Sequence, residues 1–373
     1  MKILNLLVLS IGLITFHTVL GESSPPNPPT PLEFMAPPIT SRTAILQDFN
    51  SGQVLLAKNA DERVEPASLT KLMTAYLIFQ VLNSKRIALT DTVKISEKAW
   101  RMSGSRTYLD LNTTVPVEIL LKGMIIQSGN DASVALAEYV GGSEEKFVEL
   151  MNQQAKKLGL ANTHYMNSTG LPDPQHYSTT RDLARIAQAI IQDFPDYYRW
   201  YSEKEFTYNK ITQQNRNTLL WQDNSVDGMK TGYTESAGYC LVAAAKRGNA
   251  RLISVIMGAD SQRIRAQESQ NMLDYGFRAF ESYLLYPENQ VLNTERIWQG
   301  HTSKLPLGLA APLYVTVPRG QYAQLKVTVH VNQHILAPVE VGEIQGSLRV
   351  SLGRQILTER PLIALQSVTV GNI

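Results

Sequence analysis

The chain of 373 residues contains a single cysteine, Cys240. One cysteine cannot form an internal disulfide, a structural zinc site or an iron–sulfur cluster. A lipid-anchored precursor would need a cysteine at its cleavage site, and Cys240 is far downstream of any such site. Stability must therefore come from a packed core, and Cys240, inside an apolar stretch, is interpreted as a small buried core residue.

Charge is also scarce, and neither sign predominates. Charged residues make up 18% of the chain, and 35 Lys and Arg against 33 Asp and Glu leave a net charge of +2. This balance argues against a coiled coil, a long disordered tail or a dedicated nucleic-acid-binding protein. The sequence has no phosphate-binding glycine loop, no Gly-x-Ser-x-Gly elbow and no His-Glu-x-x-His. His330 and His334 lack a third ligand nearby, so we expect neither a metal nor another cofactor.

A long hydrophobic run is found only at the N-terminus. Lys2 is followed by an almost wholly apolar stretch, residues 3–16, and then by small residues at Val19 and Gly21. This pattern is typical of a secretory signal peptide cleaved after Gly21. The alternative is an uncleaved membrane anchor, because the same stretch could just span a bilayer. We expect export to the periplasm or cell envelope, and an anchor would hold the protein at the outer face of the inner membrane.

The rest of the chain divides by composition into three parts that follow the signal peptide (residues 1–21). Residues 22–38 are rich in proline, which predicts a stiff spacer. Residues 39–283 combine helix and strand patterns, so we predict an α+β domain in which helices pack on an antiparallel sheet. Residues 284–373 have β-rich runs separated by Gly, Pro and Asn, which is typical of a small all-β sandwich domain.

Within the α+β part, residues 69–82 are apolar on nearly every helical face, which predicts a buried central helix. A hairpin is expected over residues 43–57. The ranges 227–234, 238–245 and 251–257 look like three neighbouring strands, with Gly248–Asn249 as a turn. Other helices are expected at residues 117–126, 132–140, 144–158, 180–191 and 267–283, and β-strands of the last part at residues 314–317, 325–331, 348–352 and 363–370.

The first group of residues that can carry chemistry opens the central helix. Ser68 and Lys71 are three residues apart, so on a helix they share one face. A serine hydroxyl is a weak nucleophile that needs a base within hydrogen-bond reach, and a lysine can serve if its pKa is well below the usual value. The spacing alone also fits a helix-terminal serine beside a solvated lysine. Lys71 in an otherwise apolar helix favours catalysis, because a buried unpaired charge is costly.

Two further polar groups occur at predicted element ends. Ser128 and Asn130 lie in a loop between two helices, where Asn130 can donate to a carbonyl and Ser128 can relay a proton, although such residues more often cap helices. Lys230, Thr231 and Gly232 lie on a predicted strand. Gly232 would let another backbone approach closely, whereas the alternative is an edge-strand lysine beside a bulge.

Together these groups spell Ser-x-x-Lys, Ser-x-Asn and Lys-Thr-Gly, a signature of penicillin-binding proteins and serine β-lactamases. The sequence resembles the exported low-molecular-mass penicillin-binding proteins that are D-alanyl-D-alanine carboxypeptidases, over roughly residues 40–370. The matching segments are residues 66–71, 127–132, 215–217, 226–232 and 251–254. The resemblance implies a β-lactamase/transpeptidase-like catalytic domain followed by the β-sandwich of this subfamily.

The resemblance also implies a reaction. Ser68 would attack the carbonyl between the two terminal D-alanines of a peptidoglycan stem peptide, D-alanine would leave, and water would hydrolyse the acyl-enzyme. Lys71 would be the base, Ser128 would pass a proton to the leaving amine, and Asn130 would hold the peptide amide. The backbone N–H groups of Ser68 and Tyr233 would form the oxyanion hole. β-Lactam antibiotics would acylate the same serine, and the activity would serve cell-wall maturation and cell shape.

A substrate that ends in a free carboxylate needs cations, and the candidates are Lys230, Thr231 and Arg265, with Arg263 as an alternative to Arg265. Repulsion between Lys71 and Lys230 is expected to lower the pKa of Lys71. The sequence departs from its relatives at two places. Tyr233 stands where they often have histidine, so any role of its side chain is open, and the chain ends without their basic amphipathic segment.

Three other functions stay open at this point. A serine β-lactamase shares the motifs, but no segment matching the class A glutamate is found between residues 143 and 177. A catalytically idle cell-wall scaffold and a D,D-endopeptidase that cleaves cross-links are the other two. The β-sandwich is expected to act as a spacer or as a docking module for other cell-wall enzymes.

Overall fold

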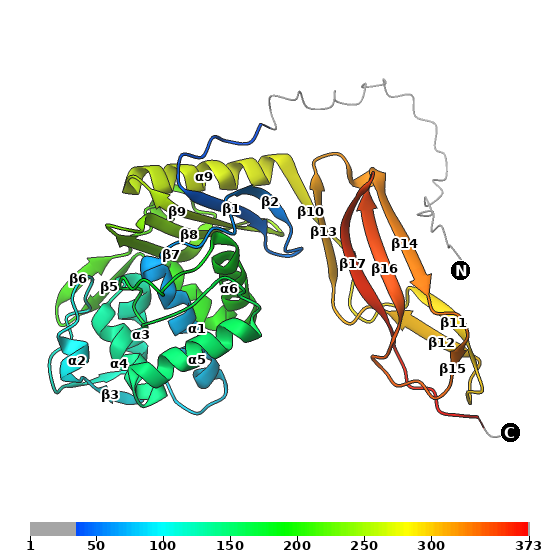
Figure 1. Ribbon diagram of the computed structural model, residues 1–373, viewed down its shortest axis with the longest axis horizontal. Helices are drawn as coiled ribbons and strands as arrows, with labels where there is room; N and C mark the ends of the chain where they lie inside the picture. The colour runs from blue at the N-terminus through cyan, green and yellow to red at the C-terminus, as the bar shows by residue number, and fades with distance from the viewer. Residues whose placement is uncertain (1–34, 372–373) are drawn as a thin grey trace, which may run out of the picture. The chain divides into compact units, whose positions relative to one another are not determined.

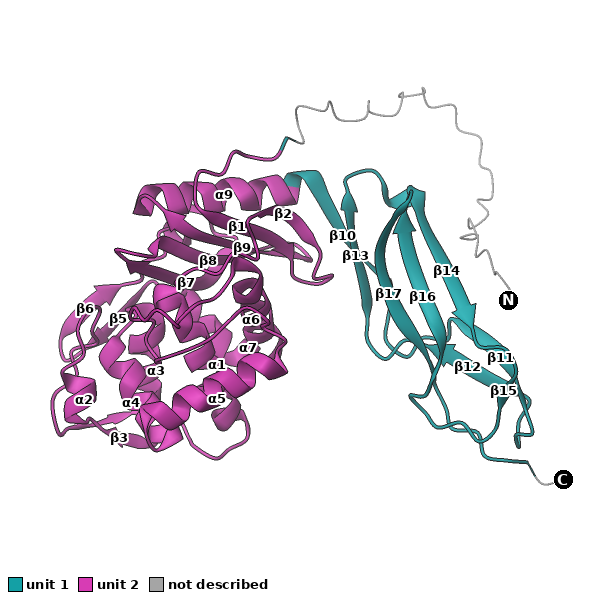
Figure 2. Cartoon of the chain, in the orientation of Figure 1, with its two compact units in different colours: residues 1–35, 278–373 teal, residues 36–277 magenta. Residues whose placement is uncertain are grey.

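The computed structural model describes residues 35–371, so the predicted signal peptide and residues 22–34 of the predicted spacer lie outside the described residues. The chain divides into two compact units (Figure 2). The first is Ala36–Phe277, and the described residues of the second are Met35 and those from Arg278 onward. This division falls six residues before the boundary expected from composition, which lay between residues 283 and 284.

The first unit is built on a five-stranded antiparallel sheet with the strand order β2-β1-β9-β8-β7. Its strands are β1 (Thr43–Asp48), β2 (Val54–Lys58), β7 (Val226–Thr234), β8 (Gly238–Arg247) and β9 (Ala250–Ala259). Because β1 pairs with both β2 and β9, the sheet joins the N-terminal hairpin to three strands formed late in the sequence. The predicted hairpin, the three neighbouring strands and their turn at Gly248–Asn249 are confirmed. Helix α9 (Gln262–Ala279) covers one face of this sheet, and a layer of several helices lies on the opposite side (Figure 1).

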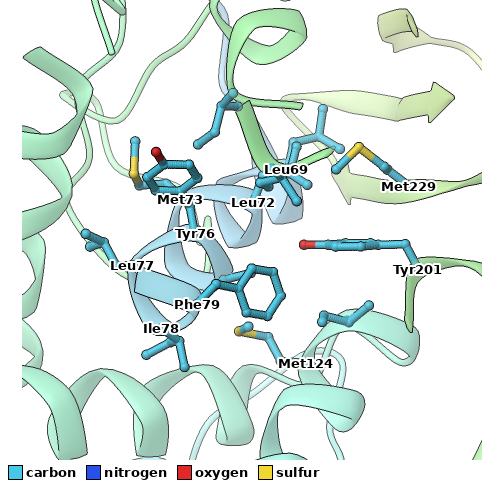
Figure 3. Close-up of a cluster of buried hydrophobic side chains, with 14 of the residues drawn as sticks. Leu69, Leu72, Met73, Tyr76, Leu77, Ile78, Phe79, Met124, Tyr201 and Met229 are labelled. Carbon is cyan, nitrogen blue, oxygen red and sulfur yellow. The ribbon is translucent and has the colours of Figure 1, made fainter. Parts of the chain in front are cut away.

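Helix α1 (Lys71–Asn83) is the centre of the helical layer, and nearly all of its side chains are buried. Figure 3 shows its apolar side chains, among them Leu72, Ile78 and Phe79, in one cluster with Met124, Tyr201 and Met229. Full burial of each large aliphatic side chain contributes about 1.5–3 kcal/mol, so this core is the main stabilising element of the unit. Around α1 lie α3 (Val117–Ile126), α4 (Asn130–Gly141), α5 (Glu144–Lys157) and α6 (Thr180–Asp193).

Short elements complete the first unit. They are η2 (Ala67–Thr70), β3 (Thr92–Lys94), α2 (Glu97–Trp100), β4 (Thr114–Pro116), α7 (Pro195–Tyr198), η3 (Arg199–Ser202), β5 (Glu205–Tyr208), β6 (Ile211–Gln214) and α8 (Leu219–Gln222). Two of the hairpins, β3–β4 and β5–β6, form separate two-stranded sheets.

Among its described residues, the second unit is all-β apart from the last two residues of α9, Arg278 and Ala279, and one short 3-10 turn, η4 (Tyr322–Gln324). A six-stranded sheet has the order β14-β16-β17-β12-β11-β15, and β10 pairs with β13 in a second sheet. The strands are β10 (Phe280–Tyr286), β11 (Asn293–Trp298), β12 (Lys304–Gly308), β13 (Leu313–Pro318), β14 (Leu325–Val331), β15 (Ile335–Leu336), β16 (Ile344–Leu352) and β17 (Gln355–Ala364). Leu305, Leu307, Val315, Leu348 and Leu362 belong to its buried core.

Two elements expected from the sequence have other bounds in the structure. The helix expected at residues 267–283 begins at Gln262, because the Ser261 hydroxyl accepts the Ile264 N–H (3.2 Å) and caps it. It ends at Ala279, since residues 280–286 pair with β13 as strand β10. The strand expected at residues 363–370 runs instead over Gln355–Ala364, and only isolated bridges follow it, at Val368 and Val370.

Across residues 35–371, no helix is long and apolar enough to cross a membrane. Within the same range, no group of His, Cys, Asp and Glu side chains could hold a metal ion. Cys240 lies in β8 and is fully buried, as its apolar neighbours in the sequence predicted.

Candidate active site

Ser68 lies in the 3-10 turn η2, which leads directly into helix α1. The preceding residue, Ala67, has a φ of +47°, a backbone conformation that costs a non-glycine residue of order 1–3 kcal/mol. Strand β7 runs beside this turn: a Cβ on Gly232 would lie 3.2 Å from the Ser68 nitrogen. The lack of a side chain at Gly232 therefore permits the close backbone approach that the sequence suggested.

The side chain of Lys71 lies next to Ser68 and is 1% exposed. Its Nζ donates to Ser68 Oγ (2.9 Å), to Asn130 Oδ1 (2.7 Å) and to the Thr169 carbonyl (2.7 Å). A neutral amine keeps two N–H groups for the latter two oxygens, and its lone pair then faces the Ser68 hydroxyl. The Lys71 amine thus lies within the hydrogen-bond reach of Ser68 Oγ that a serine nucleophile would need from a base.

Burial lowers the pKa of Lys71 to about 7, the nearby charge of Arg216 acts in the same direction, and Asp131 opposes them. Loss of solvation is therefore the leading cause, rather than the repulsion by Lys230 expected from the sequence. At neutral pH a substantial share of the amine is unprotonated, which is the form that can accept a proton.

The other buried lysine, Lys230 on β7, is 2% exposed. Its Nζ donates to Ser128 Oγ (2.8 Å) and to the Thr231 carbonyl (2.9 Å). Burial holds the pKa of Lys230 well below its usual value, and the charges of Lys71, Arg216 and Arg265 act in the same direction. The Ser128 hydroxyl thus has a positively polarised donor beside it.

Asn130 and Asp131 begin helix α4 and fix one wall of the site. The Asn130 N–H donates to Ser105 O (2.7 Å), and its side-chain amide donates to Ser103 O (2.7 Å). The buried Asp131 carboxylate accepts the backbone N–H of Thr107 (2.8 Å). Asn130 and Asp131 therefore orient the segment that contains Ser103 and Ser105.

These groups open into a cavity of about 470 Å³. It is lined by Ser68, Gly104, Ser105, Ser128, Asn130, Thr169, Gly170, Leu171, Arg216, Thr231, Gly232, Tyr233, Thr234, Tyr239, Gln262 and Arg265. No acidic side chain occurs among these lining residues, whereas two are arginines. The described cavity is therefore suited to an anionic ligand.

Arg265, on helix α9, is 4% exposed and belongs to the cavity lining, whereas Arg263 is exposed and does not. The Arg265 guanidinium donates to the carbonyls of Gly232 (3.3 Å), Cys240 (3.4 Å) and Arg216 (3.3 Å). Burial lowers the pKa of Arg265 to about 10, so the group is still charged at neutral pH.

Arg216 is a cavity residue to which sequence reasoning gave no role. It stands between Asn215 and Asn217, which are both buried. Their side-chain amides donate to Glu203 O (3.0 Å) and Gly228 O (3.0 Å), so they hold the turn that presents Arg216. The sequence pattern that could have indicated Arg216 is a single cation between two asparagines, residues that often form turns.

The side chain of Tyr233 lies at the rim of the cavity. It is 50% exposed, and its ring contacts that of Tyr239 at a centroid distance of 4.4 Å. The Tyr239 ring in turn lies under the Arg265 guanidinium, 5.7 Å from ring centroid to Cζ. The tyrosine at the position where relatives often have histidine thus belongs to an aromatic rim rather than to the hydrogen-bond network around Lys71.

Comparison with known proteins identifies the family of the chain. The family model of D-alanyl-D-alanine carboxypeptidases matches residues 31–261, and that of the penicillin-binding protein 5 C-terminal domain matches residues 280–370. The D-alanyl-D-alanine carboxypeptidase DacC of Escherichia coli (strain K12) is 46% identical over 90% of this chain and 86% of the relative. DacA of the same strain is 40% identical over 100% of this chain and 94% of the relative.

Solved structures give the same result. Penicillin-binding protein 5 of Haemophilus influenzae superposes with a TM-score of 0.86 at 41% identity, over 90% of this chain and 99% of that one. Penicillin-binding protein D2 of Listeria monocytogenes, in its ampicillin-bound form, has a TM-score of 0.59 at 30% identity over 64% of this chain and 98% of that one. The chain therefore belongs to the low-molecular-mass penicillin-binding proteins of the D-alanyl-D-alanine carboxypeptidase family.

Proposed function

We propose that this serine-type D-alanyl-D-alanine carboxypeptidase removes the terminal D-alanine of peptidoglycan stem peptides through an acyl-enzyme on Ser68. The observation that carries the proposal is the 2.9 Å contact between Ser68 Oγ and Lys71 Nζ, in a cavity lined by two arginines and no carboxylate among its described residues. A nucleophile, a base and cations for a free carboxylate are the parts that this reaction needs.

In the acylation step the neutral Lys71 amine takes the Ser68 proton while Oγ attacks the scissile carbonyl carbon. The carbonyl oxygen becomes negatively charged, and the backbone N–H groups of Ser68 and Tyr233 stabilise it. When the C–N bond breaks, the D-alanine amine needs a proton. The Ser128 hydroxyl donates that proton and takes another from the ammonium form of its neighbour Lys230, 2.8 Å away. The proton that Lys71 took from Ser68 then passes to the nearby Lys230, so that Lys71 is again neutral before hydrolysis begins.

Recognition of the C-terminal carboxylate falls to the cations of the opposite wall. The groups that can form charge-assisted hydrogen bonds with it are the side chains of Arg265, Arg216 and Lys230 and the Thr231 hydroxyl. Because Arg265 is buried and tied to backbone carbonyls, it is presented in one orientation. Asn130 would position the peptide amide with its side chain.

Hydrolysis of the acyl-enzyme needs a second proton transfer, from water. The described cavity lining offers no carboxylate for it, so the Lys71 amine is the base that the geometry supports. A β-lactam would acylate Ser68 in the same way. Its amine stays tethered to the acyl group after ring opening and blocks the approach of water, so we propose slow turnover of penicillin rather than β-lactamase activity.

The setting of the reaction is also part of the proposal. The signal-peptide pattern of the first 21 residues supports export. The substrate class supports a location in the periplasm or cell envelope, and association with the outer face of the inner membrane is part of the proposal. The all-β second unit would serve as a spacer or as a docking module for other cell-wall enzymes. We propose no nucleic-acid partner, since the net charge is only +2.

The test is release of free D-alanine from a defined pentapeptide by the wild type and Ser68→Ala. The expected result is release that Ser68→Ala abolishes and that prior incubation with penicillin blocks. Mass spectrometry should then find a single penicilloyl group on the peptide that contains Ser68. Unchanged release by folded Ser68→Ala would contradict the assignment of the nucleophile, and rapid hydrolysis of penicillin would favour a β-lactamase.

A further inference from the structure

A loop segment, residues 166–176, packs against the turn and helix that carry Ser68 and Lys71. The Thr169 carbonyl accepts a hydrogen bond from Lys71 Nζ (2.7 Å). The Ser168 carbonyl accepts from the hydroxyl of Thr74, one turn further along the helix (2.7 Å). The segment therefore contacts one face of α1 through its backbone rather than through interchangeable side chains.

The closest contact lies at Gly170, which has a φ of +87°. A Cβ on Gly170 would lie 1.7 Å from the Ala67 carbonyl oxygen and 2.8 Å from Thr70 Oγ1, so the two backbones touch. Because a peptide unit is planar and trans, the direction of the Ala67 carbonyl also fixes the direction of the Ser68 N–H. Contact with Gly170 thus sets the orientation of a donor proposed for the oxyanion hole.

The imidazole of His176 makes the second link and is 2% exposed. The Met166 N–H donates to Nδ1 (3.3 Å), so Nδ1 carries the lone pair and the neutral ring has its proton on Nε2. Nε2 lies 2.9 Å from Thr70 Oγ1 and donates to it. One ring therefore bridges the start of the loop segment and the residue just before Lys71.

The surroundings keep this ring neutral. Burial lowers the pKa of His176 to about 4, the charge of Asp173 opposes this, and His164 and Lys71 act with burial. The ring of Tyr165 also packs edge-on against the imidazole, with 5.7 Å between the two ring centroids. A protonated ring would place an Nδ1–H against the Met166 N–H, so the bridge requires the neutral form.

We propose that His176 and Gly170 are positioning residues for the reaction: they hold residues 166–176 against the nucleophile turn, so that the Ser68 N–H and the Lys71 amine stay oriented together. This inference rests on the function proposed above. Neither residue reaches the reacting atoms. His176 acts through Thr70 and the loop, and Gly170 acts through the Ala67 carbonyl.

The test separates orientation from folding. His176→Phe removes both hydrogen bonds but fills the space, Thr70→Val removes the partner hydroxyl at nearly constant volume, and His176→Gln restores one donor. His164→Phe is the matched control, because its ring contacts the Gln175 carbonyl (2.8 Å) and the Tyr177 ring (6.0 Å between centroids) but makes no hydrogen bond to Thr70. Stopped-flow acylation by a fluorescent penicillin gives the maximum acylation rate and the non-covalent Kd separately, and thermal melting reports stability.

The expected result is a fall of about 10–100-fold in the maximum acylation rate for His176→Phe and Thr70→Val, with the Kd nearly unchanged. The double variant should be no slower than the worse single variant, His176→Gln should recover part of the rate, and the His164 control should match the wild type. Gly170→Ala should lower the same rate through the Ala67 contact.

Wild-type acylation rates in folded His176→Phe and Thr70→Val would overturn the inference, as would effects that simply add in the double variant. If His176→Phe does not fold, Thr70→Val and Gly170→Ala still decide the matter. Failure of the proposed function itself would look different, since D-alanine release would then survive in Ser68→Ala whatever the positioning variants do.

Discussion

The two compact units differ in what they bury. In the unit of residues 36–277, the buried side chains include the charged groups Lys71, Lys230, Arg265 and Asp131. Among the described residues from 278 onward, the buried polar side chains are those of Thr316 and Gln345, and none is charged. The β unit also exposes large apolar side chains, such as those of Leu336, Val341 and Ile356.

The difference in buried charged side chains indicates that the chemistry belongs to the first unit. A buried charge costs several kcal/mol unless hydrogen bonds compensate for its lost hydration, so a fold keeps one only where it is well held. The three N–H groups of Lys71 all have acceptors, and Asp131 accepts backbone N–H groups. The β unit has an apolar core of the ordinary kind, which stabilises a shape but, among its described residues, buries no charged side chain.

The largest expected effect is on the acylation rate, when the buried charged group Lys71 of the first unit is replaced. Lys71→Met keeps the length of the side chain but removes the base, so acylation by penicillin should fall by about 10²–10⁴-fold. Lys326→Met makes the same change at an exposed position of β14 and should have no effect. Acylation measured by stopped-flow fluorescence decides, and equal rates for the two variants would refute the role of Lys71.

The next effect concerns the cation for the substrate carboxylate. Arg265→Leu should lower kcat/KM for a pentapeptide by about 10–100-fold, since a hydrogen bond to a charged group contributes about 1.5–3 kcal/mol. Arg263→Leu, two residues away on the same helix and exposed, is the matched control. If the Arg263 variant were the impaired one, the cavity assignment would be wrong.

A smaller, graded effect is expected from pH. The pKa of Lys71 is about 7 in the folded protein, so the neutral base is present above that pH and is lost as pH falls. The acylation rate should therefore decline about tenfold per unit below pH 7. An acid limb centred near pH 4 would exclude Lys71 as the titrating group.

The same shift predicts different pH dependence of stability for the two units. Between about pH 7 and the ordinary lysine pKa near 10.4, unfolded Lys71 binds a proton that the folded form does not. Its contribution to the stability of the first unit therefore grows as pH rises through this window. Urea unfolding from pH 7 to 10 in the wild type and Lys71→Met should show this contribution only in the wild type.

The smallest effect on activity is expected from the core of the β unit. Leu348→Ala should destabilise that unit by about 2–5 kcal/mol, because Leu348 is fully buried, yet leave the acylation rate of the folded protein unchanged. Leu72→Ala makes the same change beside Lys71 and should lower both stability and acylation. Denaturation followed together with acylation distinguishes them, and a loss of acylation in Leu348→Ala would show that the two units are coupled.

Much of the architecture was readable from local patterns. The all-round apolar run of α1, the late strands and the β-rich tail have periodicities that short segments already display. The strand β10 was missed because the segment Phe280–Tyr286 alternates weakly, and pairing with β13 decides its conformation. The end of α9 was misplaced for the same reason.

The sequence alone determined the order and identity of the reactive groups, because Ser-x-x-Lys, Ser-x-Asn and Lys-Thr-Gly are each contiguous in the chain. Only the tertiary structure decided which other residues join them. The Thr169 carbonyl and Gly170 contact the start of α1 through their backbone, and His176 contacts it through its imidazole, each from about a hundred residues away. Contacts between such distant residues leave no spacing in the sequence. The lowered pKa of Lys71 likewise depends on its burial, which only the packing of the surrounding helices and strands creates.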